Sequence, residues 1–361
     1  MMTPSFLDST CYKPKLGSKI DFGIGIVGAG AIVEAAHLPA YRKAGFNIIG
    51  ISDLRIERAQ QLADKFEIPR VYRSLEEMLL DPKVEIVDIA VPPSFQPGIL
   101  GSVLQAGKDI LGQKPLAETL AEAKLLVEQA IQRNCTLAVN ENMRWDPAIR
   151  ASRHLIREGW IGSPVLATLE VNYWENWSSW PWLIDTERLT ILFDAIHPIY
   201  SFRMLFGEPT GVYCVTGRTP NQKERGETRA VLTMEFANGM TGLLLDCSRN
   251  PTNDQFATFR FDGTDGSIKG TLGIWYNYPF GRADTLEFSS KTKSPGIWIS
   301  AELEGRWVPD AFIGPMGALM RAIEENKEPE NSGKEHLKTL SVVEAAYQSD
   351  RERRRVSPQD F

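Results

Sequence analysis

The sequence predicts an α/β chain in two parts: an amino-terminal doubly wound parallel sheet, then an α+β part with a large, mostly antiparallel open sheet. Three observations predict this. Apolar, strand-like runs alternate with helical patterns from residue 22 to about residue 143. Between residues 210 and 288, strand-like runs are instead separated by turn signals such as Asn238-Gly239 and Asp262-Gly263. The 361 residues are enough for about two domains of roughly 100–200 residues each.

Five runs in the first part are predicted to be strands. Their near-continuous hydrophobicity suits a parallel sheet covered on both faces. The runs are residues 23–27, 46–51, 84–91, 109–112 and 136–140. Between them, Ser74-Leu75-Glu76-Glu77 and Thr119-Leu120-Ala121-Glu122 match the capping box of a helix start. Residues 22–143 are therefore predicted to form a Rossmann-type domain, preceded by a polar, flexible leader over residues 1–21.

The first predicted strand runs directly into Gly28-Ala29-Gly30-Ala31-Ile32. Gly28 allows a sharp turn, Gly30 allows backbone N–H groups to approach a phosphate, and the start of the following helix favours negative charge. The second predicted strand ends at Asp53, 25 residues after Gly28, where a ribose-binding acid is expected. Val33 stands where such a loop usually has Gly or Ala. We interpret the pattern as a dinucleotide site rather than a purely structural turn.

Asp53 also bears on the choice of dinucleotide. A carboxylate there accepts a hydrogen bond from a ribose 2′-hydroxyl and repels a 2′-phosphate, so the sequence favours NAD. Arg55 could pair with a 2′-phosphate, which leaves NADP open.

Residues 144–361 are predicted to form the second domain. A helix is expected to end near residue 159, followed by a strand over 164–174, a tryptophan-rich segment and an apolar helix over about 189–206. Two helices, near residues 311–326 and 334–352, close the chain and could pack back on the first domain.

Composition narrows the function classes. A formal net charge of −6 argues against nucleic acid or an anionic membrane as the main partner. No run approaches 18 consecutive apolar residues, so no membrane span is predicted. The four cysteines are widely spaced, which favours a reducing compartment and a cytoplasmic location. No metal-binding spacing is present, so no metal is expected.

Four motifs, in order, give the chain a family resemblance. They are the glycine loop with His37-Leu38-Pro39-Ala40 downstream, Val91-Pro92-Pro93, Gln113-Lys114-Pro115-Leu116-Ala117, and Asp194-Ala195-Ile196-His197 followed by Gly207. Met143-Arg144-Trp145-Asp146-Pro147 matches a link between domains. With these motifs the chain resembles the Gfo/Idh/MocA family of NAD(P)-dependent oxidoreductases over about residues 22–350.

The resemblance implies roles for specific residues. Lys114 would hydrogen-bond the reacting oxygen and the nicotinamide ribose, His197 would be the general base or acid, and Asp194 would orient the imidazole. Without the resemblance, Lys114 would be a solvated lysine, His197 a packed core histidine, and Asp194 a capping carboxylate. The predicted cofactor contacts are Gly28, Gly30, Ala31, Ile32, Asp53, Arg55, Pro92, Pro93, Gln96, Gln113 and Lys114.

The chain departs from the family pattern at three positions. Gln113 replaces the usual Glu, the acid stands at Asp194 where the common pattern has it at position 193, and Tyr200 stands where a second Asp often occurs. Trp174, Trp177, Trp180 and Trp182 precede the predicted helix of His197. They could plug an interface, or could stack on a sugar ring or the nicotinamide. Arg144, Trp174, Trp177 and Tyr200 are the candidate substrate contacts.

The resulting hypothesis is an NAD(P)-dependent oxidoreductase that transfers hydride between the nicotinamide and a sugar, polyol or related hydroxyl compound. The resemblance also implies a homodimer or homotetramer formed through the second domain's sheet. Two alternatives stay open. One is elimination or glycoside cleavage assisted by tightly bound NAD, and the other is a non-catalytic, nucleotide-responsive regulatory protein.

Overall fold

The computed structural model describes residues 7–174, 180–249, 255–276 and 281–361. The chain divides into two compact units. The first unit holds residues 14–142 and 309–337, and the second holds residues 1–13, 143–308 and 338–361. The first unit thus takes in residues 309–337, a segment of the predicted second domain.

The first unit is built on a five-stranded parallel sheet in the order β2-β1-β3-β4-β5. The strands are β1 (Ile24–Val27), β2 (Ile48–Ser52), β3 (Ile86–Ile89), β4 (Asp109–Gly112) and β5 (Leu137–Val139). Nearly every strand side chain is buried, as the continuous apolar runs predicted. The predicted Rossmann-type parallel sheet is confirmed.

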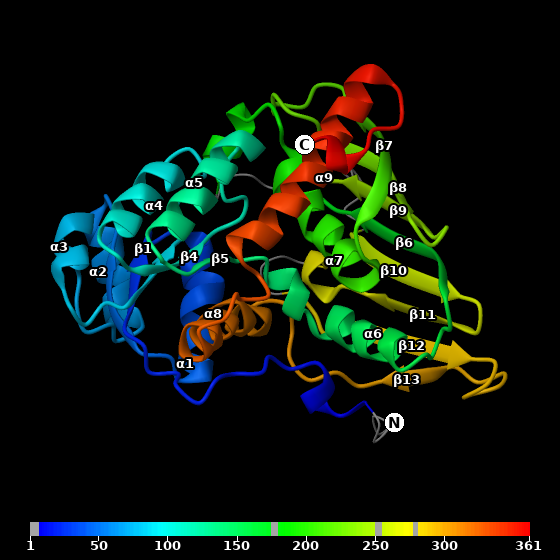
Figure 1. Cartoon of the computed structure of the whole chain (residues 1–361), viewed down its shortest axis with the longest axis horizontal. Helices are drawn as coiled ribbons and strands as arrows, with labels where there is room; N and C mark the ends of the chain where they lie inside the picture. The colour runs from blue at the N-terminus through cyan, green and yellow to red at the C-terminus, as the bar shows by residue number, and fades with distance from the viewer. Residues whose placement is uncertain (1–6, 175–179, 250–254, 277–280) are drawn as a thin grey trace. The chain divides into compact units, whose positions relative to one another are not determined.

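Helices cover this sheet in two pairs (Figure 1). One pair is α4 (Gln96–Gln105) and α5 (Leu120–Gln132); the other is α1 (Leu38–Ala44) and α8 (Ile313–Glu325). Two further α-helices, α2 (Ile56–Lys65) and α3 (Leu75–Leu80), pack against β2. The predicted caps are present: Ser74 Oγ accepts from the Glu77 amide and Thr119 Oγ1 from the Glu122 amide, both at 3.2 Å.

The second unit contains an eight-stranded sheet in the order β13-β12-β11-β10-β6-β9-β8-β7. All neighbouring strands are antiparallel except β6 and β9. The strands are β6 (Pro164–Asn172), β7 (Pro209–Gly217), β8 (Arg229–Phe236), β9 (Thr241–Cys247), β10 (Phe256–Gly263), β11 (Gly266–Thr271), β12 (Thr285–Ser290) and β13 (Ile299–Ala301). The predicted large, mostly antiparallel sheet is confirmed.

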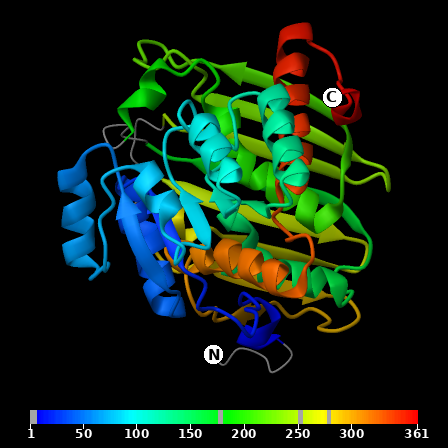
Figure 2. The same cartoon turned by 60° about the vertical axis from the view of Figure 1, so that its left-hand side comes forward.

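One face of this sheet carries helices (Figure 2). They are α6 (Pro147–Arg157), α7 (Ile196–Phe206) and the part of α9 (Gly333–Glu352) that follows Leu337. The Ser349 hydroxyl accepts from the Cys214 amide and thereby ties α9 to β7. Alternate strand residues are buried beneath the helices, while those between them reach solvent. Among the described residues, no helix is both long and apolar enough to cross a membrane.

Candidate active site

The glycine loop after β1 has the backbone that a phosphate-binding turn requires. Gly28 has φ +107°, and a Cβ built there would lie 2.3 Å from the carbonyl oxygen of Ala90. Among the described residues, and apart from its own chain neighbours, a Cβ at Gly30 would meet no atom within 4 Å. Gly28 is therefore required by the fold itself, whereas the missing side chain of Gly30 leaves open space beside the first helical turn.

Asp53, the residue after β2, holds this loop in place. Its Oδ2 accepts a hydrogen bond from the Ala29 amide at 2.7 Å, and its Oδ1 accepts from the Arg55 amide at 2.8 Å. Arg58 Nε donates to the Ala29 carbonyl at 3.1 Å. The Asp53 side chain is only 13% exposed, whereas that of Arg55 is 72% exposed. The carboxylate is thus positioned by backbone groups, and the largely exposed Arg55 side chain lies with its Nε 3.5 Å from Asp53 Oδ1.

Lys114 lies two residues after the end of β4, at the carboxyl edge of the parallel sheet. Ligands bind at this edge in open α/β sheets. The Lys114 side chain is half-buried. The fully buried side chain of Gln96, at the start of α4, hydrogen-bonds to the backbone of residues 113, 115 and 116. The loop that carries Lys114 is therefore built into the sheet edge.

A buried polar network explains why position 113 is an amide. Gln113 Oε1 accepts from the Lys114 amide at 2.9 Å, so its Nε2 is the group that faces His37 Nε2 at 3.1 Å. His37 Nε2 must then accept, which leaves the hydrogen on Nδ1, 2.7 Å from Asp88 Oδ2. A glutamate at 113 would offer His37 Nε2 an acceptor in place of a donor, so the imidazole would have to carry hydrogens on both nitrogens.

Tyr41 completes this network. Its hydroxyl donates to Asp88 Oδ2 at 2.8 Å. Burial raises the pKa of Tyr41 well above its ordinary value, and the Asp88 carboxylate raises it further. The tyrosine therefore stays a donor, and the network beneath Gln113 stays fixed.

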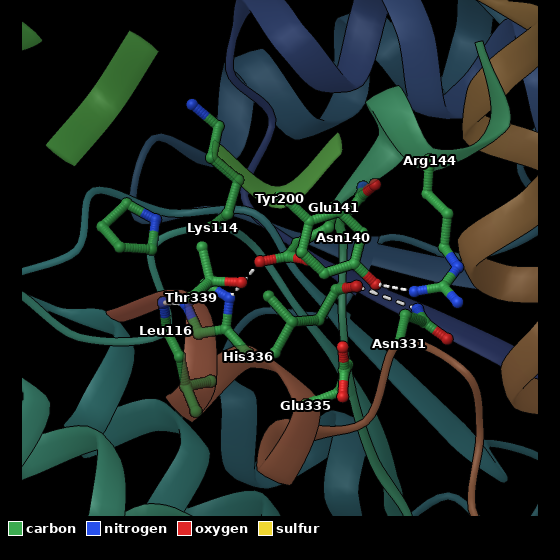
Figure 3. A network of polar contacts seen from close by, with 12 residues as sticks. Lys114, Leu116, Asn140, Glu141, Arg144, Tyr200, Asn331, Glu335, His336 and Thr339 are labelled. Carbon is green, nitrogen blue, oxygen red and sulfur yellow. Dashed lines mark hydrogen bonds and ion pairs between the residues drawn. The ribbon is translucent and has the colours of Figure 1, made fainter. Parts of the chain in front are cut away.

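A second buried histidine contacts the same loop from the other end. The Leu116 amide donates to His336 Nε2 at 3.2 Å, and His336 Nδ1 lies 2.5 Å from Glu141 Oε1 (Figure 3). Because Nε2 accepts, Nδ1 carries the hydrogen and donates to the carboxylate. Both His336 and Glu141 are nearly fully buried.

In the second unit, a six-residue π-helix (Thr190–Ala195) leads into α7 and His197. Glu227 anchors its start: Oε2 accepts from the Leu189 amide at 3.1 Å and Oε1 from the Ile191 amide at 3.0 Å. His197 is half-buried, with its ring edge-on to Trp307 at a centroid distance of 5.3 Å. The imidazole is thus held by packing at the start of a well-anchored helix.

Two acids belong to this region, Asp194 within the π-helix and Asp246 on β9. Asp194 Oδ2 accepts a hydrogen bond from the Tyr173 hydroxyl at 2.6 Å. Asp246, on β9, is buried, and within the described part of the chain neither of its oxygens has a hydrogen-bond partner. Burial raises the pKa of Asp246 well above its ordinary value, and the charges of Asp194 and Glu227 raise it further. The surroundings of Asp246 therefore disfavour its charged form.

The comparisons with known proteins match both halves. Residues 22–141 match the oxidoreductase family with an NAD-binding Rossmann fold, and residues 149–269 match the GFO/IDH/MocA C-terminal domain. The chain is 30% identical over 326 residues to D-apiose dehydrogenase of Paraburkholderia graminis, covering 89% of this chain and 85% of that protein. The chain belongs to the Gfo/Idh/MocA family.

Solved structures support the fold of this Gfo/Idh/MocA chain. An oxidoreductase from Agrobacterium radiobacter, solved with NAD⁺, L-tartaric acid and magnesium, matches with TM-score 0.83 at 23% identity, covering 94% of this chain and 99% of that one. Levoglucosan dehydrogenase, solved with NADH and L-sorbose, matches with TM-score 0.79 at 20% identity and the same coverages.

The residues of the first unit fit the NAD that this family binds. The positive φ of Gly28, the open space at Gly30 and the anchored carboxylate of Asp53 fit a phosphate turn and a ribose acceptor, and their contacts with NAD stay predictions. Ala31, Ile32, Pro92 and Gln113 are half-buried and Pro93 is buried, and their predicted cofactor contacts stay predictions. Gln96 differs from these residues, because its side-chain amide already hydrogen-bonds to backbone groups of residues 113, 115 and 116.

The candidate substrate residues behave differently from one another. Trp174 is 48% exposed, with Arg249 over its ring at 5.2 Å. Arg144 and Tyr200 are both buried, and the arginine donates to the tyrosine hydroxyl (Figure 3). Trp177 lies outside the described residues.

Sequence reasoning missed several residues that position the site. These are Tyr41, Arg58, Asp88, Glu141, Tyr173, Glu227, Asp246 and His336. His37 belongs to a sequence motif, but its contacts with Asp88 and Gln113 do not follow from that motif. No local pattern marks the others, because each acts through a partner distant in the sequence.

Proposed function

We propose that this protein is an NAD-dependent dehydrogenase that oxidises a hydroxyl group of a sugar or polyol, with Lys114 and His197 acting at the reacting alcohol. One observation carries the proposal: the residue expected to touch the alcohol, Lys114, follows β4 on a loop held by three buried side chains. The named activity of the relative from Paraburkholderia graminis, a D-apiose dehydrogenase, supports a sugar as the substrate class.

The chemistry assigns one task to each residue. Oxidation of an alcohol breaks a C–H bond, whose hydride goes to the nicotinamide of bound NAD⁺, and an O–H bond, whose proton needs a base. His197 would take that proton, because an imidazole titrates near neutral pH. The Lys114 ammonium would stabilise the negative charge that develops on the oxygen. Asp194, fixed by Tyr173, would favour the protonated imidazole.

The remaining candidates supply substrate contacts in this proposal. The half-exposed Trp174 would stack on the apolar face of a sugar ring. Arg144 and Tyr200 would support the substrate region as a buried hydrogen-bonded pair.

The decisive experiment is a screen of aldoses and polyols with NAD⁺, followed by Lys114→Ala and His197→Ala on the best substrate. Each change should lower kcat by about 10²- to 10⁴-fold. His197→Ala should leave the Kd of NADH unchanged. Lys124→Ala, an exposed lysine on α5, is the matched control and should keep normal rates. Near-normal rates in both site variants would refute the assignment.

We further propose a homo-oligomer formed through the free face of the eight-stranded sheet. Tyr213, Val215 and Val231 reach solvent on adjoining strands, each about 40% exposed, and Val215 pairs directly with Val231. Contiguous apolar side chains of this kind often mark protein interfaces. Val231→Asp should shift the mass measured by light scattering toward the monomer, and an unchanged mass would exclude this face. The four cysteines, all unbridged, support work in a reducing compartment such as the cytoplasm.

A further inference from the structure

The Gln96 side chain makes more hydrogen bonds to the backbone of the protein than a residue that contacts a cofactor would need. It is fully buried at the first position of α4. Its Nε2 lies 2.8 Å from the carbonyl oxygen of Gln113, 2.9 Å from that of Pro115 and 3.0 Å from that of Leu116. Its Oε1 accepts from the Gln113 amide at 2.8 Å. One amide group therefore bonds to the backbone on both sides of Lys114.

Only a primary amide satisfies this arrangement. Three carbonyl oxygens need donors and one N–H needs an acceptor, and an amide offers two N–H groups and an oxygen. A glutamate would keep the acceptor but direct an oxygen toward three carbonyls. A histidine in either neutral tautomer would offer a single N–H. Unpaired carbonyls in a buried site are costly, so the loop would have to move if the amide were lost.

The loop is held on its other side as well. The Leu116 amide donates to His336, and Gln113 is bound to His37, so the residues flanking Lys114 are fixed from two directions. Figure 3 shows the Lys114 side chain extending away from His336. The backbone at Lys114 is thus held in place by these hydrogen bonds, while its side chain points away from His336 (Figure 3).

We propose that Gln96 is a positioning residue that sets where the Lys114 ammonium lies, and that it does not contact the cofactor. The inference rests on the proposed role of Lys114 at the alcohol. A positioning residue matters because a displacement of about 1 Å at a catalytic group can cost roughly 100-fold in rate.

The test is a graded series at position 96 in the full-length protein. Gln96→Met has a similar volume and no donors, and Gln96→His restores one donor. Gln105→Glu, at the exposed end of the same helix, is the matched control. For each variant we would measure kcat and KM on the best sugar substrate, the Kd of NADH, and amide hydrogen exchange of residues 113–116.

Gln96→Met should lower kcat by about 10- to 100-fold and speed exchange at the Gln113 and Leu116 amides, with the Kd of NADH within about threefold of wild type. Gln96→His should give values of kcat and amide exchange between those of wild type and Gln96→Met. It provides the test if the methionine variant does not fold. A large rise in the Kd of NADH at unchanged kcat would overturn the proposal and make Gln96 a cofactor contact. Unchanged kcat and exchange would also overturn it.

A double-mutant cycle separates this inference from the function on which it rests. If Gln96 acts through Lys114, Gln96→Met should have little further effect on kcat in the Lys114→Ala background. An undiminished effect there would refute the positioning role even if Lys114 is catalytic. Normal kcat in Lys114→Ala alone would instead refute the proposed function. Faster exchange in Gln96→Met would still show that Gln96 holds the backbone of residues 113–116 in place.

Discussion

Two glycines of the same loop serve different purposes, and alanine at each should separate them. At Gly28, the backbone is left-handed and a methyl group would overlap the Ala90 carbonyl. Gly28→Ala should therefore destabilise the fold, by about 1–3 kcal/mol, and weaken NAD binding as a consequence. At Gly30, a methyl group would have no contact within 4 Å among the described residues beyond its chain neighbours, so Gly30→Ala should leave the Tm unchanged and still weaken NAD binding.

Thermal unfolding without ligand and NADH titration by fluorescence give the two readouts. Each variant serves as the control for the other, since both add one methyl group within three residues of chain. A Gly30→Ala variant that binds NADH as wild type would show that the open space beside Gly30 is not the phosphate site.

At the scale of single residues, the sequence predicted those positions whose role follows from the neighbouring residues in the chain. The glycines and Asp53 are recognisable because their spacing follows the strands that precede them. The amide at Gln113 looked like a departure from the family, and only the structure explains it. Its partner, His37, lies 76 positions earlier in the chain. Sequence patterns within one segment do not show which nitrogen of His37 accepts a hydrogen bond.

Among the elements, α5 offers a direct test of a predicted cap. Thr119 Oγ1 accepts from the Glu122 amide, one of the first amides of α5, which have no partner within the helix. Thr119→Ala should lower the free energy of unfolding by about 1 kcal/mol, and Thr119→Ser should have little effect, because serine keeps the oxygen. Urea unfolding monitored by circular dichroism measures both. A serine variant as unstable as the alanine variant would show that the methyl group, not the cap, is responsible.

The helix caps and most strands were predicted, but the π-helices were not. Val33–His37 and Thr190–Ala195 both adopt π geometry, and both precede or contain a histidine of the site region. A π turn widens the helix without changing the apolar composition, so the 3.6-residue pattern hides it. For the second one, the anchor is Glu227, whose contact with Leu189 spans 38 positions.

The division of the whole molecule depends on long-range pairing that the sequence does not encode locally. Residues 309–337 belong with the parallel sheet because Asn331 pairs with its edge: the Val139 amide donates to the Asn331 carbonyl at 2.8 Å, and Asn331 Nδ2 donates back to the Val139 carbonyl at 2.8 Å. These residues lie 192 positions apart. Patterns taken in order along the chain predict a boundary near residue 143 and leave open whether the closing helices pack back on the first domain; in the structure, residues 309–337 group with residues 14–142.

The pH dependence of unfolding tests a buried acid pair in the second unit. Asp146 caps α6 by accepting from the Ile149 amide, and Asp284 accepts from the Gly273 amide at 2.7 Å. Burial raises the pKa of Asp284 to about 6. Burial also raises the pKa of Asp146 well above its ordinary value, and the neighbouring Asp284 carboxylate adds to that rise.

The sign follows from proton counting. Between about pH 4 and pH 6 the folded protein holds a proton on Asp284 that the unfolded chain has already released, so the free energy of unfolding should fall as the pH rises through this window. Asp284→Asn keeps the acceptor for Gly273 and removes the titration. In urea unfolding series, the free energy of unfolding of this variant minus that of wild type should therefore increase as the pH rises from 4 to 6. Asp21→Asn, at an exposed site, should show no such trend, and a pH-independent difference for Asp284→Asn would mean that this carboxyl does not carry the excess proton.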